Sequence, residues 1–122
     1  MGDFRRLKVW QKAKDLSILI YQFTSDGDFA IDFGLKNQLR RAAVSIPSNI
    51  AEGDELDTNS QSIRHFYISK GSVAEVLTQT IIAQEIGYID KAQFNEVETK
   101  CRAISGMLTR LIQARKSKED LP

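Results

Sequence analysis

The sequence of 122 residues predicts an all-α protein, folded as an antiparallel four-helix bundle whose helices run up, down, up and down. Apolar residues recur at alternating steps of three and four along four segments, which is the spacing of one helix face. The chain contains only 2 prolines and 7 glycines, so the turn residues that separate the strands of sheet proteins are sparse. We expect a single domain over residues 1–122, because splitting this length would leave two very small cores.

The first helix is expected over residues 7–24. Its apolar stripe follows steps of four, three, four and three residues: Val9, Ala13, Leu16, Ile20 and Phe23. A cluster of turn-forming residues, 25–28, should end this helix, because Ser, Asp and Gly favour turns and caps.

The second helix is expected over residues 33–52, with an apolar stripe of Leu35, Leu39, Ala42, Ala43, Ile46 and Ile50. Pro47 lies inside it and has no N–H group to bond the carbonyl of Ala43. We expect a bend at Pro47 rather than a break, because the apolar register continues to Ile50. Gly53 is expected to end the helix in the left-handed conformation.

A polar stripe lies beside the apolar one on this second helix: Gln38, Arg41, Ser45, Asn49 and Glu52. These residues also follow steps of three and four, so they share one side of the helix. We interpret the polar stripe as mainly structural, forming hydrogen bonds to another helix or subunit.

The third helix is expected over residues 59–86, with a core stripe of Ile63, Phe66 or Tyr67, Val73, Leu77 and Ile81. Four further residues widen its apolar surface beyond one bundle contact: Ile68, Val76, Ile82 and Ile86. Surplus apolar surface of this kind predicts a homo-oligomer.

The fourth helix is expected over residues 91–116. Asp90 followed by Gln93 fits a reciprocal capping box at its start. Its core stripe is the most regular in the chain: Phe94, Val97, Cys101, Ile104, Leu108 and Leu111.

The formal net charge is only +1, but the basic residues concentrate in the first and last segments of the chain. Because Lys and Arg attract phosphate without reading bases, these segments are candidates for binding RNA or DNA. We interpret four residues as candidate phosphate contacts: Lys12, Arg40, Arg41 and Arg110. An ion pair is the alternative role for Arg40 or Arg41.

No pattern of catalytic or cofactor-binding residues is found. The chain has 1 His and 1 Cys, and no glycine-rich phosphate loop, so we predict neither an enzyme nor a bound cofactor or metal. The acidic residues Glu52, Asp54, Glu55 and Asp57 leave a metal-dependent nuclease as a remote alternative. No export signal or apolar run of membrane-spanning length is found, so we expect a cytoplasmic protein with no membrane partner.

Three parts of the sequence carry a family resemblance: Phe4 and Leu7 with residues 9–13, the block 38–53, and Gly71-Ser72 followed by Glu75. They resemble the bacterial four-helix-bundle family first noticed as open reading frames in intervening sequences of 23S ribosomal RNA genes. The resemblance extends over roughly Phe4 to Lys116. It implies a homopentamer without established enzymatic activity. A related branch comprises accessory proteins of diversity-generating retroelements, which bind reverse transcriptase and nucleic acid.

Together, the residues and the resemblance predict a non-enzymatic homo-oligomeric scaffold, pentameric by resemblance. Its expected partners are copies of itself and RNA, DNA or a nucleic-acid enzyme such as a reverse transcriptase, engaged through repeated basic patches. The alternative is a pure protein–protein interaction module that binds no nucleic acid.

Overall fold

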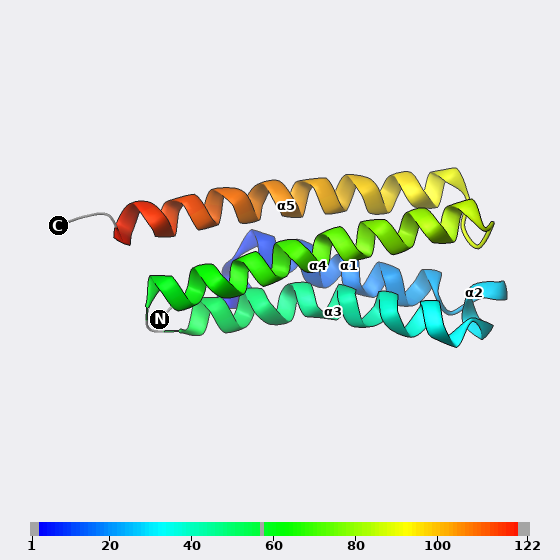
Figure 1. The fold of residues 1–122 in the computed structure, drawn as a ribbon, viewed down its shortest axis with the longest axis horizontal. Helices are drawn as coiled ribbons and strands as arrows, with labels where there is room; N and C mark the ends of the chain where they lie inside the picture. Colours follow the sequence, from blue (N-terminus) through cyan, green and yellow to red (C-terminus); the bar gives the residue numbers. More distant parts are fainter. Residues whose placement is uncertain (1–2, 57, 120–122) are drawn as a thin grey trace.

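The structure is a computed structural model that describes residues 3–56 and 58–119. It contains the short helices η1 (Phe4–Arg6) and α2 (Gly27–Ile31), and the long helices α1 (Lys8–Phe23), α3 (Phe33–Glu55), α4 (Asn59–Glu85) and α5 (Lys91–Glu119). The long helices lie side by side in an antiparallel bundle (Figure 1), so the predicted fold class is confirmed. The sequence predicts only a turn over residues 25–28, whereas a short helix, α2, begins at Gly27.

Each long helix packs against two others. α1 contacts α3 and α5, and α4 contacts the same two helices, so α1 and α4 occupy opposite corners of the bundle. In Figure 1, α4 accordingly crosses in front of α1. The centre is filled by apolar side chains from all four long helices, among them Leu16, Ile20, Leu39, Ile46, Ile50, Phe66, Val76, Val97, Ile104 and Leu108. Within the described residues, none of these helices combines the length and apolarity needed to cross a membrane.

α3 continues through Pro47 without breaking. A proline at this position leaves the carbonyl of Ala43 without its usual helical donor. The buried hydroxyl of Ser17, on α1, donates a hydrogen bond to that carbonyl at 2.8 Å. The neighbouring helix therefore satisfies the acceptor that the proline leaves free.

The prediction that Gly53 ends the second helix is wrong. α3 extends to Glu55, and among the described residues the glycines with positive φ are Gly27 and Gly87. A Cβ at position 53 would lie 2.6 Å from Cε1 of Phe66, which is closer than carbon atoms can approach. Gly53 is thus a close-packing position, where the ring of Phe66 lies directly against the backbone of α3.

The core stripe of α4 also differs from the predicted one. Ile81 is 38% exposed, Tyr67 is exposed, and Val76, expected on the outer surface, is fully buried. The inward face follows steps of four and three and includes several small residues beside Phe66: Ser62, Phe66, Ser69, Val73, Val76, Thr80 and Ala83. Periodicity counted on large apolar side chains alone missed this face, because buried serines carry no apolar signal.

Serine hydroxyls at the α3–α4 contact find backbone acceptors. Ser62 donates to the carbonyl of Gly53 at 2.6 Å, and Ser69 donates to that of Ile46 at 2.9 Å. A buried hydroxyl with a partner avoids the desolvation penalty of an unpaired one. These hydrogen bonds allow small polar side chains to occupy the core and bring the two helices close together.

The turn between α4 and α5 is anchored at both ends. The reciprocal capping box is present, since Asp90 accepts from the Gln93 amide at 2.8 Å and the Gln93 side chain accepts from the Asp90 amide at 3.0 Å. Tyr88 donates its hydroxyl hydrogen to Asp32 at 2.9 Å, tying the turn to the start of α3. The hydrogen bonds from the backbone of Leu35 and from Tyr88 lower the pKa of Asp32.

Replacing Ser17 with Ala should lower the free energy of unfolding by about 1–3 kcal/mol, because the carbonyl of Ala43 loses its donor. In a Pro47→Ala background, the amide of residue 47 supplies that donor, and Ser17→Ala should cost less. Chemical denaturation of the four proteins in this double-mutant cycle measures the coupling. Equal costs in the two backgrounds would refute the link between Ser17 and Pro47.

Candidate interaction surfaces

Part of the polar stripe joins α3 to α4 through side-chain hydrogen bonds. Ser72 of α4 donates to the hydroxyl of Ser45 at 2.9 Å, and the amide of Asn49 donates to the same hydroxyl at 3.1 Å. Nδ1 of His65 lies 3.0 Å from Oδ1 of Asn49 and 3.4 Å from Oε2 of Glu52. This network lies within one chain and positions the two helices relative to each other.

The other two members of the polar stripe, Gln38 and Arg41, lie outside this network. Both are exposed, and Arg41 makes no side-chain hydrogen bond or ion pair with the described residues. His65 is a member of this α3–α4 hydrogen-bond network that was not predicted from the sequence. Its spacing of seven from Ser72 places both on one side of α4, which is the signal that indicates the shared contact.

Arg40 is engaged at the C-terminal end of α1. Its Nε donates to the hydroxyl of Thr24 at 2.7 Å, and a terminal nitrogen reaches the hydroxyl of Ser25 and the carbonyl of Tyr21 at 3.1 and 3.3 Å. The guanidinium carbon also lies 4.3 Å from the centre of the Tyr21 ring. The cation thus stabilises the negative end of the α1 dipole and ties α3 to α1.

Lys12 and Arg110 lie on a different side of the bundle, where α1 meets α5. Lys12 and Lys100 line one hollow of about 220 Å³, together with Asp15. Arg110 and Lys8 line another hollow, of about 240 Å³, between the same two helices. The fold therefore brings cations from both ends of the sequence together in an α1/α5 basic face, defined by Lys8, Lys12, Lys100 and Arg110.

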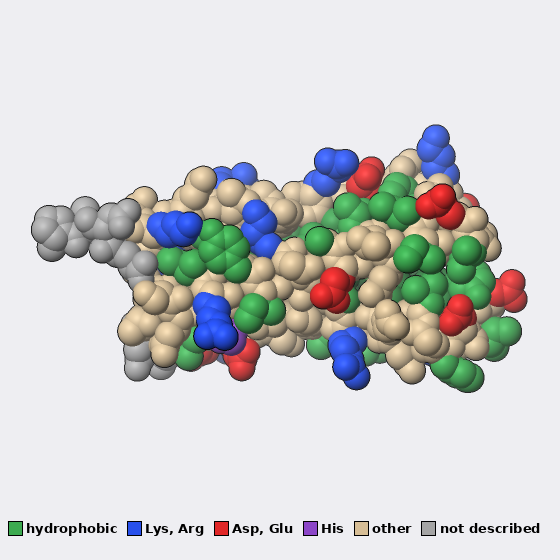
Figure 2. Space-filling model, viewed as in Figure 1, with side chains coloured by type: hydrophobic (Ala, Val, Ile, Leu, Met, Phe, Trp, Pro, Cys, Tyr) green, Lys and Arg blue, Asp and Glu red, His purple; other side chains and the backbone are tan. Residues whose placement is uncertain are grey.

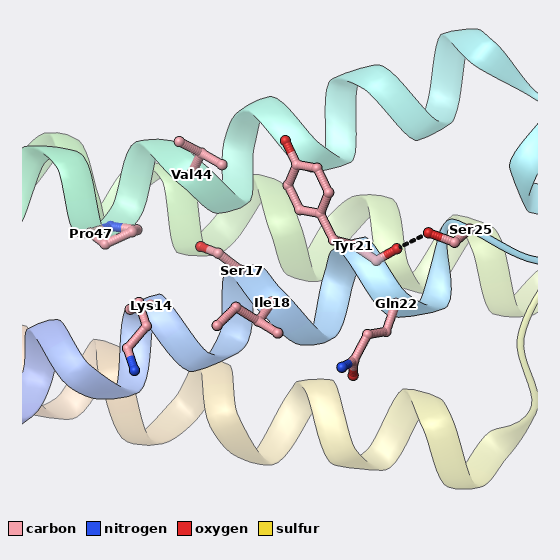
Figure 3. A pocket seen from close by; sticks show the side chains of 8 residues that line it. All are labelled: Lys14, Ser17, Ile18, Tyr21, Gln22, Ser25, Val44 and Pro47. Atoms are coloured by element: carbon pink, nitrogen blue, oxygen red, sulfur yellow. Dashed lines mark hydrogen bonds between the residues drawn. The ribbon is translucent and has the colours of Figure 1, made fainter.

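An apolar groove of about 440 Å³ lies between α1 and α3 on the outside of the bundle. Ile18 and Tyr21 line it from α1, and Val44 and Pro47 line it from α3 (Figure 3). Ile18 remains 49% exposed, which is high for an isoleucine at a helix contact. We call this surface the α1/α3 groove.

A second apolar surface lies on the outward face of α4. Its isoleucines are Ile68, Ile82 and Ile86, of which Ile82 is 44% and Ile86 53% exposed. Figure 2 shows hydrophobic side chains gathered over the end of the bundle that holds the α4–α5 turn, with acidic side chains among them. Ile82 and Ile86 lie toward that end, and Ile68 lies fourteen residues before Ile82 on the same side of the helix. We call these three isoleucines the α4 ridge.

The carboxylates proposed for the nuclease alternative point to different partners. Glu52 lies against His65, whereas Asp54 forms a largely buried ion pair with Arg115 at 3.2 Å. Asp57 lies outside the described residues. Across residues 3–56 and 58–119, no three His, Cys, Asp or Glu side chains are grouped so as to hold a metal ion.

Cys101 is a buried side chain of the α5 core. Burial raises the pKa of its thiol to about 12, with a smaller contribution from the charge of Glu98. Since the thiolate is the reactive form, this environment suppresses nucleophilic chemistry at Cys101.

Cys101 should therefore resist alkylation in the folded protein. At pH 8 about one thiol in ten thousand is ionised when the pKa is near 12, and the side chain is also sterically covered. Mass spectrometry after iodoacetamide treatment should show unmodified protein, whereas protein unfolded in guanidinium should be fully alkylated. Equal rates for the folded and unfolded chains would contradict the buried placement.

Comparison with known proteins shows where this bundle belongs. Its structure is similar to the crystal structure of a protein of unknown function from the S23 ribosomal protein family of Bacteroides thetaiotaomicron VPI-5482, with a TM-score of 0.79 at 20% sequence identity. That similarity covers 85% of this chain and 97% of the other. A search of curated proteins finds no match. The family profile described as 23S rRNA-intervening sequence protein matches residues 5–110, and with this match over most of its length the chain belongs to that family.

Proposed function

We propose that the protein is a non-enzymatic homo-oligomeric scaffold. The observation that supports assembly is the exposure of two separate apolar surfaces, the α1/α3 groove and the α4 ridge, by one chain. Fully burying an isoleucine or valine side chain contributes about 1.5–3 kcal/mol. Association through these surfaces removes their apolar area from water, so it stabilises the assembled state.

Five subunits are proposed because of the resemblance carried by the block 38–53. Apolar surface area favours association but does not determine how many chains associate. A ring with five copies would also repeat every surface of the protomer five times, including the α1/α5 basic face. Weak contacts at each copy then combine into stronger binding of a long ligand.

Light scattering coupled to size exclusion should give a mass close to five times the subunit mass of 13.8 kDa. The mass should persist upon dilution into the low micromolar range if the apolar surfaces are fully buried. A mass of one subunit at every concentration would refute the scaffold proposal.

We further propose that the α1/α5 basic face binds the phosphate backbone of RNA or DNA. Lys12 and Arg110, two of the candidate contacts, lie on this face with Lys8 and Lys100. Arg40 is less suited to this role because its guanidinium is already occupied by α1.

Fluorescence anisotropy with labelled RNA and DNA of unrelated sequences tests this interface. Affinities should be similar among sequences and should fall steeply as salt rises, because binding releases counterions. Lys12→Ala combined with Arg110→Ala should weaken binding and reduce the salt dependence. Arg41→Ala with Lys36→Ala removes the same charge from α3, and a smaller effect than that of the first pair would place the predicted Arg41 contact outside this interface.

Lack of binding at low salt by an intact oligomer would refute the nucleic-acid interface. The protein–protein interaction module would then be the remaining reading. A partner captured after nuclease treatment, and identified as a protein that binds the purified oligomer directly, would support that reading.

A further inference from the structure

We infer that the α1/α3 groove of one subunit receives the α4 ridge of a second copy of this chain, in a head-to-tail contact. The inference rests on the proposed homo-oligomer and specifies which surfaces meet. The two surfaces lie on different helices, and α4 occupies the corner of the bundle opposite α1. A chain with two distinct, separated apolar surfaces can use each of them once in a contact that repeats from subunit to subunit.

The two surfaces are complementary in shape. The groove is concave, with Ile18 on one wall and Val44 on the other, and Pro47 is among the residues that line it. The ridge is the convex outer side of a single helix, on which Ile82 lies one turn before Ile86, the C-cap residue of α4. An apolar helix face that enters a groove between two helices is a recurrent mode of recognition.

The charges beside the two surfaces are also complementary. Lys14 lines the groove, and its ion pair is with the adjacent exposed residue Asp15, at 3.0 Å. Such a pair contributes little stability, so Lys14 can exchange its partner at small cost. Glu75 and Glu85 are exposed on α4 near Ile82 and Ile86, and neither forms an ion pair with any described residue. The cation Arg64 lies at the other end of the ridge, beside Ile68.

A symmetric contact between two identical surfaces fits these observations less well. Two α4 ridges centred on each other would place two convex surfaces together and bring the exposed Glu75 of one copy close to Glu75 of the other, and two grooves would place hollow surfaces against each other. Juxtaposed like charges disfavour such pairings. The head-to-tail contact instead pairs apolar with apolar surface and a cation with acids. It also leaves the α1/α5 basic face, on another side of the bundle, open to ligands.

The test uses two full-length variants that each disable one surface. Ile18→Glu places a charge in the groove, and Ile82→Glu places one on the ridge. Each variant alone should lose assembly and give the mass of one subunit, because every contact needs one groove and one ridge. An equimolar mixture should give a mass of two subunits, because the intact groove of one variant accepts the intact ridge of the other.

Ala114→Glu, an apolar-to-acidic change on the exposed side of α5, is the matched control and should keep the wild-type mass. Circular dichroism and thermal melting establish that each variant is folded. Val44→Glu and Ile86→Glu repeat the experiment at second positions on the two surfaces, and they decide the result if a first variant fails to fold.

The possible outcomes separate this inference from the scaffold proposal. A wild-type chain of one-subunit mass overturns both. A wild-type oligomer whose single variants form two-subunit species, or whose mixture yields no heterodimer, overturns the head-to-tail contact and leaves the scaffold proposal intact. Variants that retain the wild-type mass show that other surfaces assemble the oligomer, and they also overturn the inference.

Discussion

The close approach of α3 to α4 is the constraint on which the rest of this bundle depends. It requires glycine at position 53, where any side chain would collide with Phe66. It also requires small residues along the inward face of α4, including Ser62 and Ser69, whose hydroxyls bond to carbonyls of α3. Because these small residues occupy the face of α4 that the core needs, several large apolar residues of the same helix lie outside it. The exposed α4 ridge is thus a consequence of the packing that holds the bundle together.

Polar side chains join neighbouring helices at several points of the bundle. Ser17 bonds the carbonyl released by Pro47, and Arg40 binds the carbonyl end of α1. The network from Ser72 to Glu52 adds side-chain contacts between α3 and α4. Since unpaired buried polar groups are costly, these hydrogen bonds favour one relative position of the helices over neighbouring ones.

The surfaces proposed for interaction are separated on the molecule. Cations from α1 and α5 share one face, whereas the groove and the ridge lie on other sides of the bundle. A subunit built in this way can contact its neighbours and a charged ligand at the same time. In the proposed scaffold, assembly would multiply the α1/α5 basic face while leaving it exposed.

The sequence by itself determined the all-α class, the long helical segments and the capping box at Asp90, because periodicity and capping depend on residues close together in the chain. Only the tertiary structure decided that three serines of α4, at positions 62, 69 and 72, point inward and that Gly53 lies within a helix. It also decided that Arg40 caps α1 while Lys12 and Arg110 both lie where α1 meets α5. Each of these features joins residues that are distant in the chain. Their physical basis is the distance and orientation between helices. The periodicity of a sequence shows which residues share a helix face, but it does not show how two helices are placed.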